Sequence, residues 1–163
     1  MWRIGAAALA VAAAAGVVAA QMGWHRAGGL GRGAGTLRVT ANSVEYVDGK
    51  RVWVAGKDGF LASSVDNGAT WTEVKTPVTA ELNDIYFRSG DDGWAVGADG
   101  WVLSTDDGGR SWRSFQLESF REGPERGRKF DLYSIRFGDK KNGWVVGDEG
   151  TIFATSDAGR TWI

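Results

Sequence analysis

The sequence predicts an all-β protein of about three four-stranded antiparallel β-propeller-type blades, following an N-terminal signal or anchor helix. Three observations predict this fold. A Gly-Trp motif recurs along the chain, and each copy is followed by a second motif, Ser/Thr-x-Asp-x-Gly-x-Thr/Ser-Trp. The composition of 25 Gly and nine Trp in 163 residues, with 43% apolar residues, excludes a disordered or collagen-like chain and favours repetition.

The amino terminus is predicted to direct export. Arg3 supplies a positive charge, residues 4–20 are an unbroken run of Ala, Val, Leu, Ile and Gly, and Val18-Ala19-Ala20 offers the small residues of a cleavage site. Residues 1–20 are therefore interpreted as a signal peptide or a membrane anchor, and uncleaved they would tether the protein to the membrane. We expect a periplasmic or otherwise extracytoplasmic protein, or one anchored by its N-terminus. Residues 21–36 are predicted to be a flexible Gly-rich tether.

The repeats fill residues 37–163. The Gly-Trp motif, present in a weaker copy as Val52-Trp53, places Trp53, Trp94 and Trp144 at equivalent positions, with spacings of 41 and then 50 residues. The same two spacings hold at every other matched position, which composition bias would not produce. The predicted blades span about 37–78, 79–130 and 131–163.

Within each unit, apolar and polar residues alternate between Gly- and Asp-rich turns, a pattern typical of short strands. First strands are expected at 84–87 and 134–137, second strands at 94–96 and 144–146, third strands at 101–104 and 151–154, and fourth strands from Trp71 and Trp112. Gly97–Gly100 and Gly147–Gly150 are expected to be hairpin turns.

The second motif is interpreted as structural. Its Asp can accept backbone N–H groups of its own turn, its Gly permits a left-handed residue, and its Trp packs onto the blade. Burying one Trp ring removes about 150–250 Å² from water. The motif residues are Ser64, Asp66, Gly68 and Trp71, then Thr105, Asp107, Gly109 and Trp112, then Thr155, Asp157, Gly159 and Trp162.

This motif is the Asp-box, or bacterial neuraminidase repeat (BNR). Together with Gly93-Trp94-Ala95-Val96-Gly97, it makes residues 37–163 resemble the photosystem II stability/assembly factor-like propeller proteins. The resemblance implies a non-enzymatic scaffold that binds a protein partner, such as a subunit of a membrane complex, and in phototrophs assists photosystem II. Asp-boxes also occur in sialidases, xyloglucan hydrolases and sorting receptors, so a fragment of an Asp-box glycoside hydrolase is the alternative.

Other chemistry finds little support in the sequence. The absence of Cys and the single His exclude thiolate nucleophiles and Cys- or His-pair metal sites. With 19 basic and 20 acidic residues there is no basic excess for nucleic acid. Most acidic residues lie in predicted turns, so no catalytic set, metal site or cofactor is expected.

Residues 114–130 interrupt the repeat and hold its nine extra residues. They are either a solvated connection between blades or a partner-binding loop, since Arg and aromatic residues are favoured at interfaces. The candidate contact residues are Arg121, Arg126, Arg128 and Lys129.

The sequence stops at Trp162-Ile163, at the start of an expected fourth strand of the third blade. Closed propellers use four to eight blades. Three blades therefore predict a piece of a longer propeller, an open arc, or a ring completed by other copies. If the propeller is incomplete, exposed blade faces predict self-association.

Overall fold

The computed structural model describes residues 24–26, 39–68, 70–119, 124 and 126–163. The predicted signal or anchor helix at 1–20 lies outside the described residues, as does most of the predicted tether. In the described part of the chain, no helix has the length and apolar character needed to cross a membrane.

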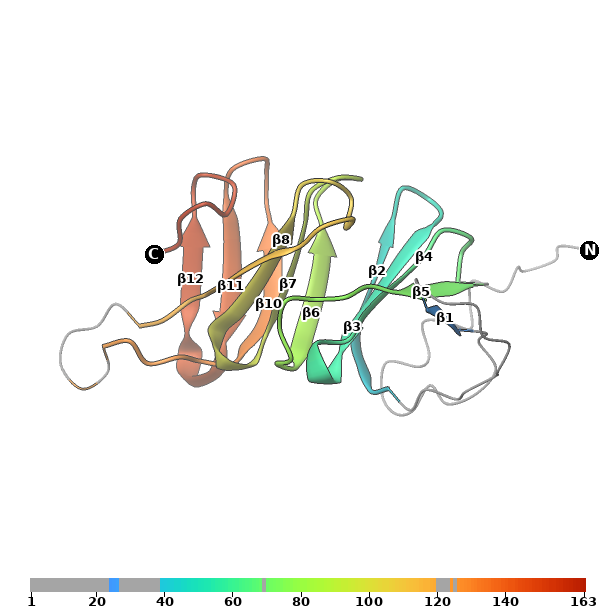
Figure 1. Cartoon of the computed structure of the whole chain (residues 1–163). Helices are drawn as coiled ribbons and strands as arrows, with labels where there is room; N and C mark the ends of the chain where they lie inside the picture. The colour runs from blue at the N-terminus through green and yellow to red at the C-terminus, as the bar shows by residue number, and fades with distance from the viewer. Residues whose placement is uncertain (1–23, 27–38, 69, 120–123, 125) are drawn as a thin grey trace, which may run out of the picture.

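Three sheets stand side by side (Figure 1). The first contains β2 (Ala41–Val47), β3 (Arg51–Gly56), β4 (Leu61–Ser64) and β5 (Trp71–Glu73). The second contains β6 (Leu82–Phe87), β7 (Gly93–Gly97), β8 (Trp101–Thr105) and β9 (Arg113–Gln116). The third contains β10 (Leu132–Phe137), β11 (Gly143–Gly147) and β12 (Ile152–Thr155). These strands pair antiparallel in chain order, which confirms the predicted all-β, propeller-type blades.

The third sheet continues beyond β12 at one residue. Ile163 exchanges both backbone hydrogen bonds with Ala154 of β12, at 2.8 and 2.9 Å. This pairing occupies the place that β5 and β9 take in the first two sheets. The expected start of a fourth strand is therefore observed at Ile163.

The predicted tether contains one short strand, β1 (Trp24–Arg26), which the sequence did not indicate. It pairs in parallel with β5, with Trp24 opposite Trp71. The outer edge of β5 would otherwise present unpaired backbone groups, and β1 supplies their partners. The first sheet therefore has five strands.

Tight type I′ turns join the second and third strands of every sheet. In the first turn, the Phe60 amide donates to the Lys57 carbonyl oxygen at 2.9 Å, across Asp58 and Gly59 with φ of 57° and 69°. The predicted hairpin turns of the other two sheets occur as expected, but their left-handed residues are Asp99-Gly100 and Glu149-Gly150. The turn type requires positive φ at both central residues, which Asp and Gly tolerate best.

Gly97 is needed for a different reason. Its backbone is extended, with φ of −165°. A Cβ added there would lie well under 3.0 Å from the Glu81 carbonyl oxygen. The glycine therefore lets β7 approach the backbone that enters β6, and Gly56 and Gly147 occupy the equivalent places in the other sheets.

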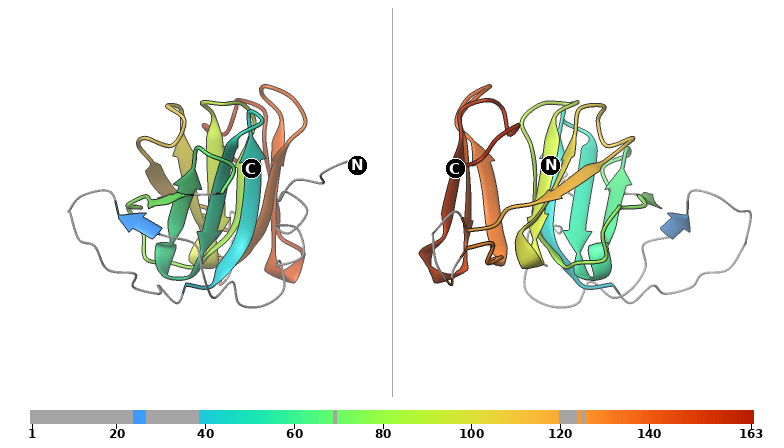
Figure 2. Two further views of the ribbon diagram at one scale, coloured as in Figure 1. Left: turned by 90° about the vertical axis from the view of Figure 1, so that its right-hand side faces the viewer. Right: turned by 60° about the vertical axis from the view of Figure 1, so that its left-hand side comes forward.

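The first strands β2, β6 and β10 are the innermost strands, and they lie next to one another (Figures 1 and 2). Side-chain amides link them at equivalent repeat positions. Asn42 Nδ2 donates to the Leu82 carbonyl oxygen at 3.0 Å, and Asn83 Nδ2 donates to the Leu132 carbonyl oxygen at 2.9 Å. The same polar contact thus sets the alignment of both pairs of neighbouring blades.

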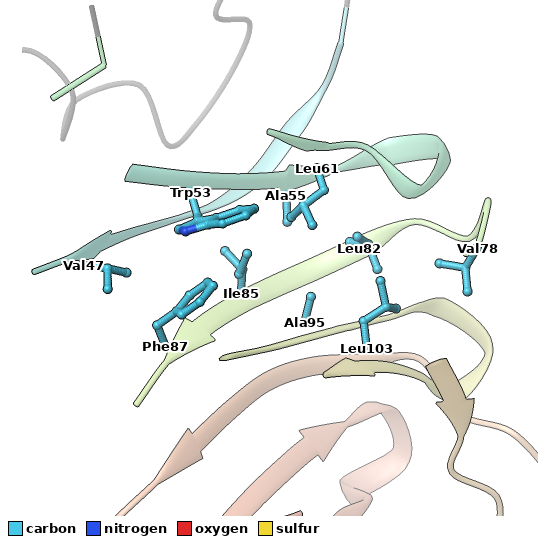
Figure 3. Close-up of a cluster of buried hydrophobic side chains, with 10 residues drawn as sticks. All are labelled: Val47, Trp53, Ala55, Leu61, Val78, Leu82, Ile85, Phe87, Ala95 and Leu103. Atoms are coloured by element: carbon cyan, nitrogen blue, oxygen red, sulfur yellow. The ribbon is translucent and has the colours of Figure 1, made fainter. Parts of the chain in front are cut away.

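The core lies between the sheets. Figure 3 shows the cluster between the first two, where Trp53 stacks on Phe87 with ring centroids 5.2 Å apart. The cluster between the second and third sheets repeats it, with Trp94 stacked on Phe137 at 4.2 Å. Trp53 and Trp94 of the repeated motif therefore make an inter-blade contact, in which each ring packs against the next blade along the chain.

Candidate protein-binding surface

The Asp-box turns connect the third and fourth strands at one end of the sheets (Figure 1). The Asp107 carboxylate accepts hydrogen bonds from the hydroxyls of Thr105 (2.8 Å) and Ser111 (2.6 Å) and from the Ser111 amide (2.9 Å). Thr105 Oγ1 in turn accepts the Gly109 amide at 2.9 Å. Equivalent bonds form around Asp66 and Asp157. These carboxylates hold their own turns.

The same hydrogen bonds keep two of these carboxylates ionised. The Ser111 hydroxyl, followed by the Ser111 amide, holds the pKa of Asp107 far below its usual range. The Thr161 hydroxyl and amide lower the pKa of Asp157 to about 2. A hydrogen bond to the charged form of an acid favours that form, so both turns are anionic at neutral pH.

The Asp-box tryptophans pack into the blades. Trp71 and Trp162 are 5% exposed, and their indole N–H groups donate to the carbonyl oxygens of Gly68 (3.0 Å) and Gly159 (3.2 Å). Trp112 meets the edge of Trp53 at 5.8 Å in the core between the first two sheets. The structure thus brings the four Asp-box residues of each blade together as one turn and one packed ring.

The predicted partner-binding loop precedes β10. Arg128 forms an ion pair with Glu149 in the turn between β11 and β12, and its guanidinium lies 5.2 Å from the Phe130 ring. Lys129 Nζ donates to Gln116 Oε1 at 2.6 Å, whereas Arg126 is exposed. Arg121 lies outside the described residues. Two of the candidate cations are therefore engaged within the chain, and partner binding by this loop stays a prediction.

A second surface lies on the innermost strands. Glu45, Tyr86 and Arg136 occupy equivalent repeat positions on β2, β6 and β10, and we call them the inner-strand row. The Arg136 guanidinium lies 5.4 Å from the Tyr86 ring. The Tyr86 hydroxyl donates to the Phe137 carbonyl oxygen at 3.4 Å. The row presents an acid, an aromatic ring and a base on three neighbouring strands.

Asp84 lies at the base of the row with its carboxylate buried. Its Oδ1 accepts the Ser43 hydroxyl at 2.9 Å, and its Oδ2 accepts the Ser134 hydroxyl (3.0 Å), the Ile135 amide (3.0 Å) and Arg136 Nη1 (2.6 Å). These contacts join all three innermost strands. They also fix Arg136, whose side chain is 56% exposed and presents a guanidinium to solvent.

Glu45 has a different electrostatic setting. Burial is the main cause that raises the pKa of its carboxyl, while the Phe87 amide and the Arg136 charge oppose the rise. Within the described residues, no group of three His, Cys, Asp or Glu side chains is placed to hold a metal ion. The row therefore offers groups for hydrogen bonding, ion pairing and aromatic contact.

Sequence reasoning missed this row. Tyr86 and Arg136 lie within the expected first strands at 84–87 and 134–137, where the sequence pattern assigns them no role. The signal was present, because the 41- and 50-residue spacings align positions 45, 86 and 136. Unlike the Trp and Gly positions, this one holds three different chemistries in three blades.

A sequence model of the photosynthesis system II assembly factor YCF48 family matches residues 69–163, which is more than half of the chain. The chain belongs to this family. The matched region contains the second and third sheets and the complete Asp-boxes of both. No curated protein gives a significant match to the sequence.

Solved structures match a larger share of the chain than the family model does. A structure of YCF48 bound to D1 peptide has a TM-score of 0.63 at 24% identity, covering 77% of this chain and 40% of that chain. YCF48 from Cyanidioschyzon merolae has a TM-score of 0.63 at 19% identity, covering 77% and 39%. An ancestral GH74 enzyme has a TM-score of 0.59 at 16% identity, covering 75% and 18%. The chain thus spans about 40% of the length of the YCF48 structures, and at these identities the likeness establishes a shared fold.

Proposed function

We propose that this protein is a non-enzymatic binding scaffold that engages a polypeptide segment of a membrane-complex subunit. The observation that carries the proposal is the family membership, taken together with the relative that was solved with a D1 peptide bound. In a phototroph, the complex would be photosystem II, and the protein would assist its assembly.

The inner-strand row is the surface we assign to the peptide. An extended segment laid across β2, β6 and β10 would meet Glu45, Tyr86 and Arg136 in turn. A carboxylate of the segment would pair with Arg136, whose guanidinium Asp84 already orients. A preoriented Arg loses less side-chain entropy on binding, and charge-assisted hydrogen bonds are the stronger class.

Export and membrane attachment complete the proposal. Residues 4–20 would direct the chain across the membrane and, if uncleaved, tether it beside its partner. Fractionation of cells that produce the tagged chain tests this step. We expect it in the extracytoplasmic or membrane fraction, and recovery of the full-length chain with cytoplasmic markers would contradict it.

Binding is tested by fluorescence polarisation with the labelled D1 peptide. We expect saturable binding that weakens about tenfold or more in Arg136→Ala, because a charge-assisted contact contributes roughly 1.5–3 kcal/mol. Arg113→Ala is the matched control, since Arg113 is also an exposed arginine paired with one aspartate, Asp106, but lies away from the row on β9. Equal affinities of the two variants would refute the assignment of the row, and no binding by the folded wild type would refute peptide binding itself.

A fragment of an Asp-box glycoside hydrolase is the second candidate, because the ancestral GH74 enzyme shares the fold. Incubation with xyloglucan and with fluorogenic sialosides distinguishes the two functions. We expect no released sugar or fluorophore. Turnover that survives purification, and that is lost on substituting a single carboxylate, would favour the hydrolase.

A further inference from the structure

The outer face of the third sheet exposes large apolar side chains. Trp144 is 48% exposed, Val146 40% and Ile152 65%. They lie on β11 and β12, and we call them the third-blade face. Exposed aromatic and aliphatic groups gathered on one sheet mark an interaction surface.

The repeat shows what covers such a face. The equivalent residues of the second blade, Trp94, Val96 and Val102, are 4%, 0% and 0% exposed, and those of the first blade are equally buried. In both cases, the covering element is the innermost strand of the next blade. That strand contributes an Ile and a Phe to the contact, Ile85 and Phe87 in one case and Ile135 and Phe137 in the other.

The first blade exposes the complementary half of this contact. Val44 and Tyr46 on β2 stand at the repeat positions of Ile85 and Phe87 but are 52% and 60% exposed. Ile85 and Phe87 are 0% and 6% exposed. We call Val44 and Tyr46 the first-blade face. Among the described residues, one copy of each side of this interface is thus unmatched, while the interface itself forms twice within the chain.

We propose that two copies of this chain associate head to tail, with the third-blade face of one copy on the first-blade face of the other. Trp144 of one copy would stack on Tyr46 of the second, as Trp94 stacks on Phe137. Such a contact is heterologous, so each pair keeps one free face of each kind and further copies can add.

Charge complementarity also favours a second copy of the chain docked head to tail. Two neighbouring members of the inner-strand row meet across a blade boundary, where the Arg136 guanidinium lies over the Tyr86 ring. Head-to-tail docking would continue the row from Arg136 of one copy to Glu45 of the next. A base would then face an acid, whereas docking two third-blade faces on each other would bring like residues together.

Sedimentation velocity on the full chain tests the proposal, with three variants. Ile152→Asp places a carboxylate in the third-blade face, and Val44→Asp places one in the first-blade face. Val65→Asp is the matched control, because Val65 is 67% exposed, close to the 65% of Ile152, and lies in an Asp-box turn outside both faces. A carboxylate buried in an apolar contact without a partner is strongly disfavoured, so we expect at least about tenfold weaker association of both face variants and none of this effect in the control.

Mixing the two face variants gives the decisive result. Each retains the face that the other has lost, so an equimolar mixture should form a one-to-one dimer although each variant alone is monomeric. A monomeric wild type would overturn the proposal, and so would self-association of Val44→Asp through two third-blade faces. Association that neither face variant weakens would place the contact outside both faces and overturn the proposal as well. Peptide affinity is measured separately with Arg136→Ala, so either idea can fail alone.

Discussion

Replacing Gly109 by Ala should destabilise the protein by more than the same change at Gly68. Both glycines occupy the same Asp-box position, and both have φ of 85°. They differ in what an added Cβ would meet. At Gly109, the Cβ would lie well under 3.0 Å from Cη2 and Cζ2 of Trp53 in the preceding blade, whereas at Gly68 the nearest atom is Cζ2 of Trp71 at 3.5 Å.

The magnitude has a shared and a specific part. An L-residue in the left-handed region costs about 1–2 kcal/mol, which applies to both variants. Forcing an extra carbon into a packed core costs about 1–3 kcal/mol more, which applies to Gly109→Ala alone, because the Trp53 ring is held between Phe87 and Trp112. We therefore expect Gly109→Ala to be less stable than Gly68→Ala by about 1–3 kcal/mol.

Thermal and urea unfolding, followed by circular dichroism, measures this difference. For a domain of this size, the two melting temperatures should differ by about 2–12 °C, with Gly109→Ala the lower. Equal losses would mean that backbone conformation alone sets the cost, and that the Asp-box glycine does not seat the tryptophan of the preceding blade. That result would refute the role assigned here to Gly109.

Two further predictions concern carboxylates. Because the pKa of Asp157 is lowered to about 2 from 3.8, its contribution to stability is present above about pH 4 and is lost as the pH falls toward 2. The urea midpoint should decrease over that window, and Asp157→Asn should flatten part of the decrease; an unchanged pH profile would count against the turn assignment. Asp84→Ala should lower the free energy of unfolding by about 1–3 kcal/mol, because it leaves the buried Ile135 amide and the Ser43 and Ser134 hydroxyls without their acceptor. Asp106→Ala, which breaks an exposed ion pair with Arg113, should cost less than about 1 kcal/mol. Chemical denaturation of both variants checks the contrast, and similar losses would contradict it.

Much of the fold could be predicted from the sequence because its signals are local. The Gly-Trp strands, the Asp-box turns and the hairpins each depend on residues a few positions apart, and their repetition made the assignment secure. β1 could not be predicted, because its pairing with β5 spans more than forty residues and Trp24–Arg26 carries no strand pattern of its own. The partner-binding loop was suggested by composition, which does not reveal that Arg128 pairs with Glu149.

Burial was the harder property to foresee. Trp94 and Trp144 have the same motif and the same spacing, yet one is 4% exposed and the other 48%, because only the first has a blade packed on it. Asp84 resembles an ordinary strand residue in the sequence. Its role depends on Ser43 and Ser134, which are 41 and 50 residues away and which only the stacking of blades brings to its carboxylate.

The repeats also separate structural positions from candidate functional ones. Trp53 and Trp94 make the same ring contact in successive blades, and the Asp-box turns form the same hydrogen bonds in each blade. This repetition indicates that the backbone geometry requires those residues. Positions 45, 86 and 136 share the same strand geometry but hold Glu, Tyr and Arg. Because the same strand position accommodates all three side chains, packing does not determine which residue stands there. A surface position that packing does not constrain is where we expect side chains to contact a binding partner. By the same reasoning, Trp144 occupies a position whose equivalents, Trp53 and Trp94, pack against a neighbouring blade, but it is itself half exposed. The third-blade face is therefore a packing surface, whereas the inner-strand row is a candidate binding surface, and separate variants test each one.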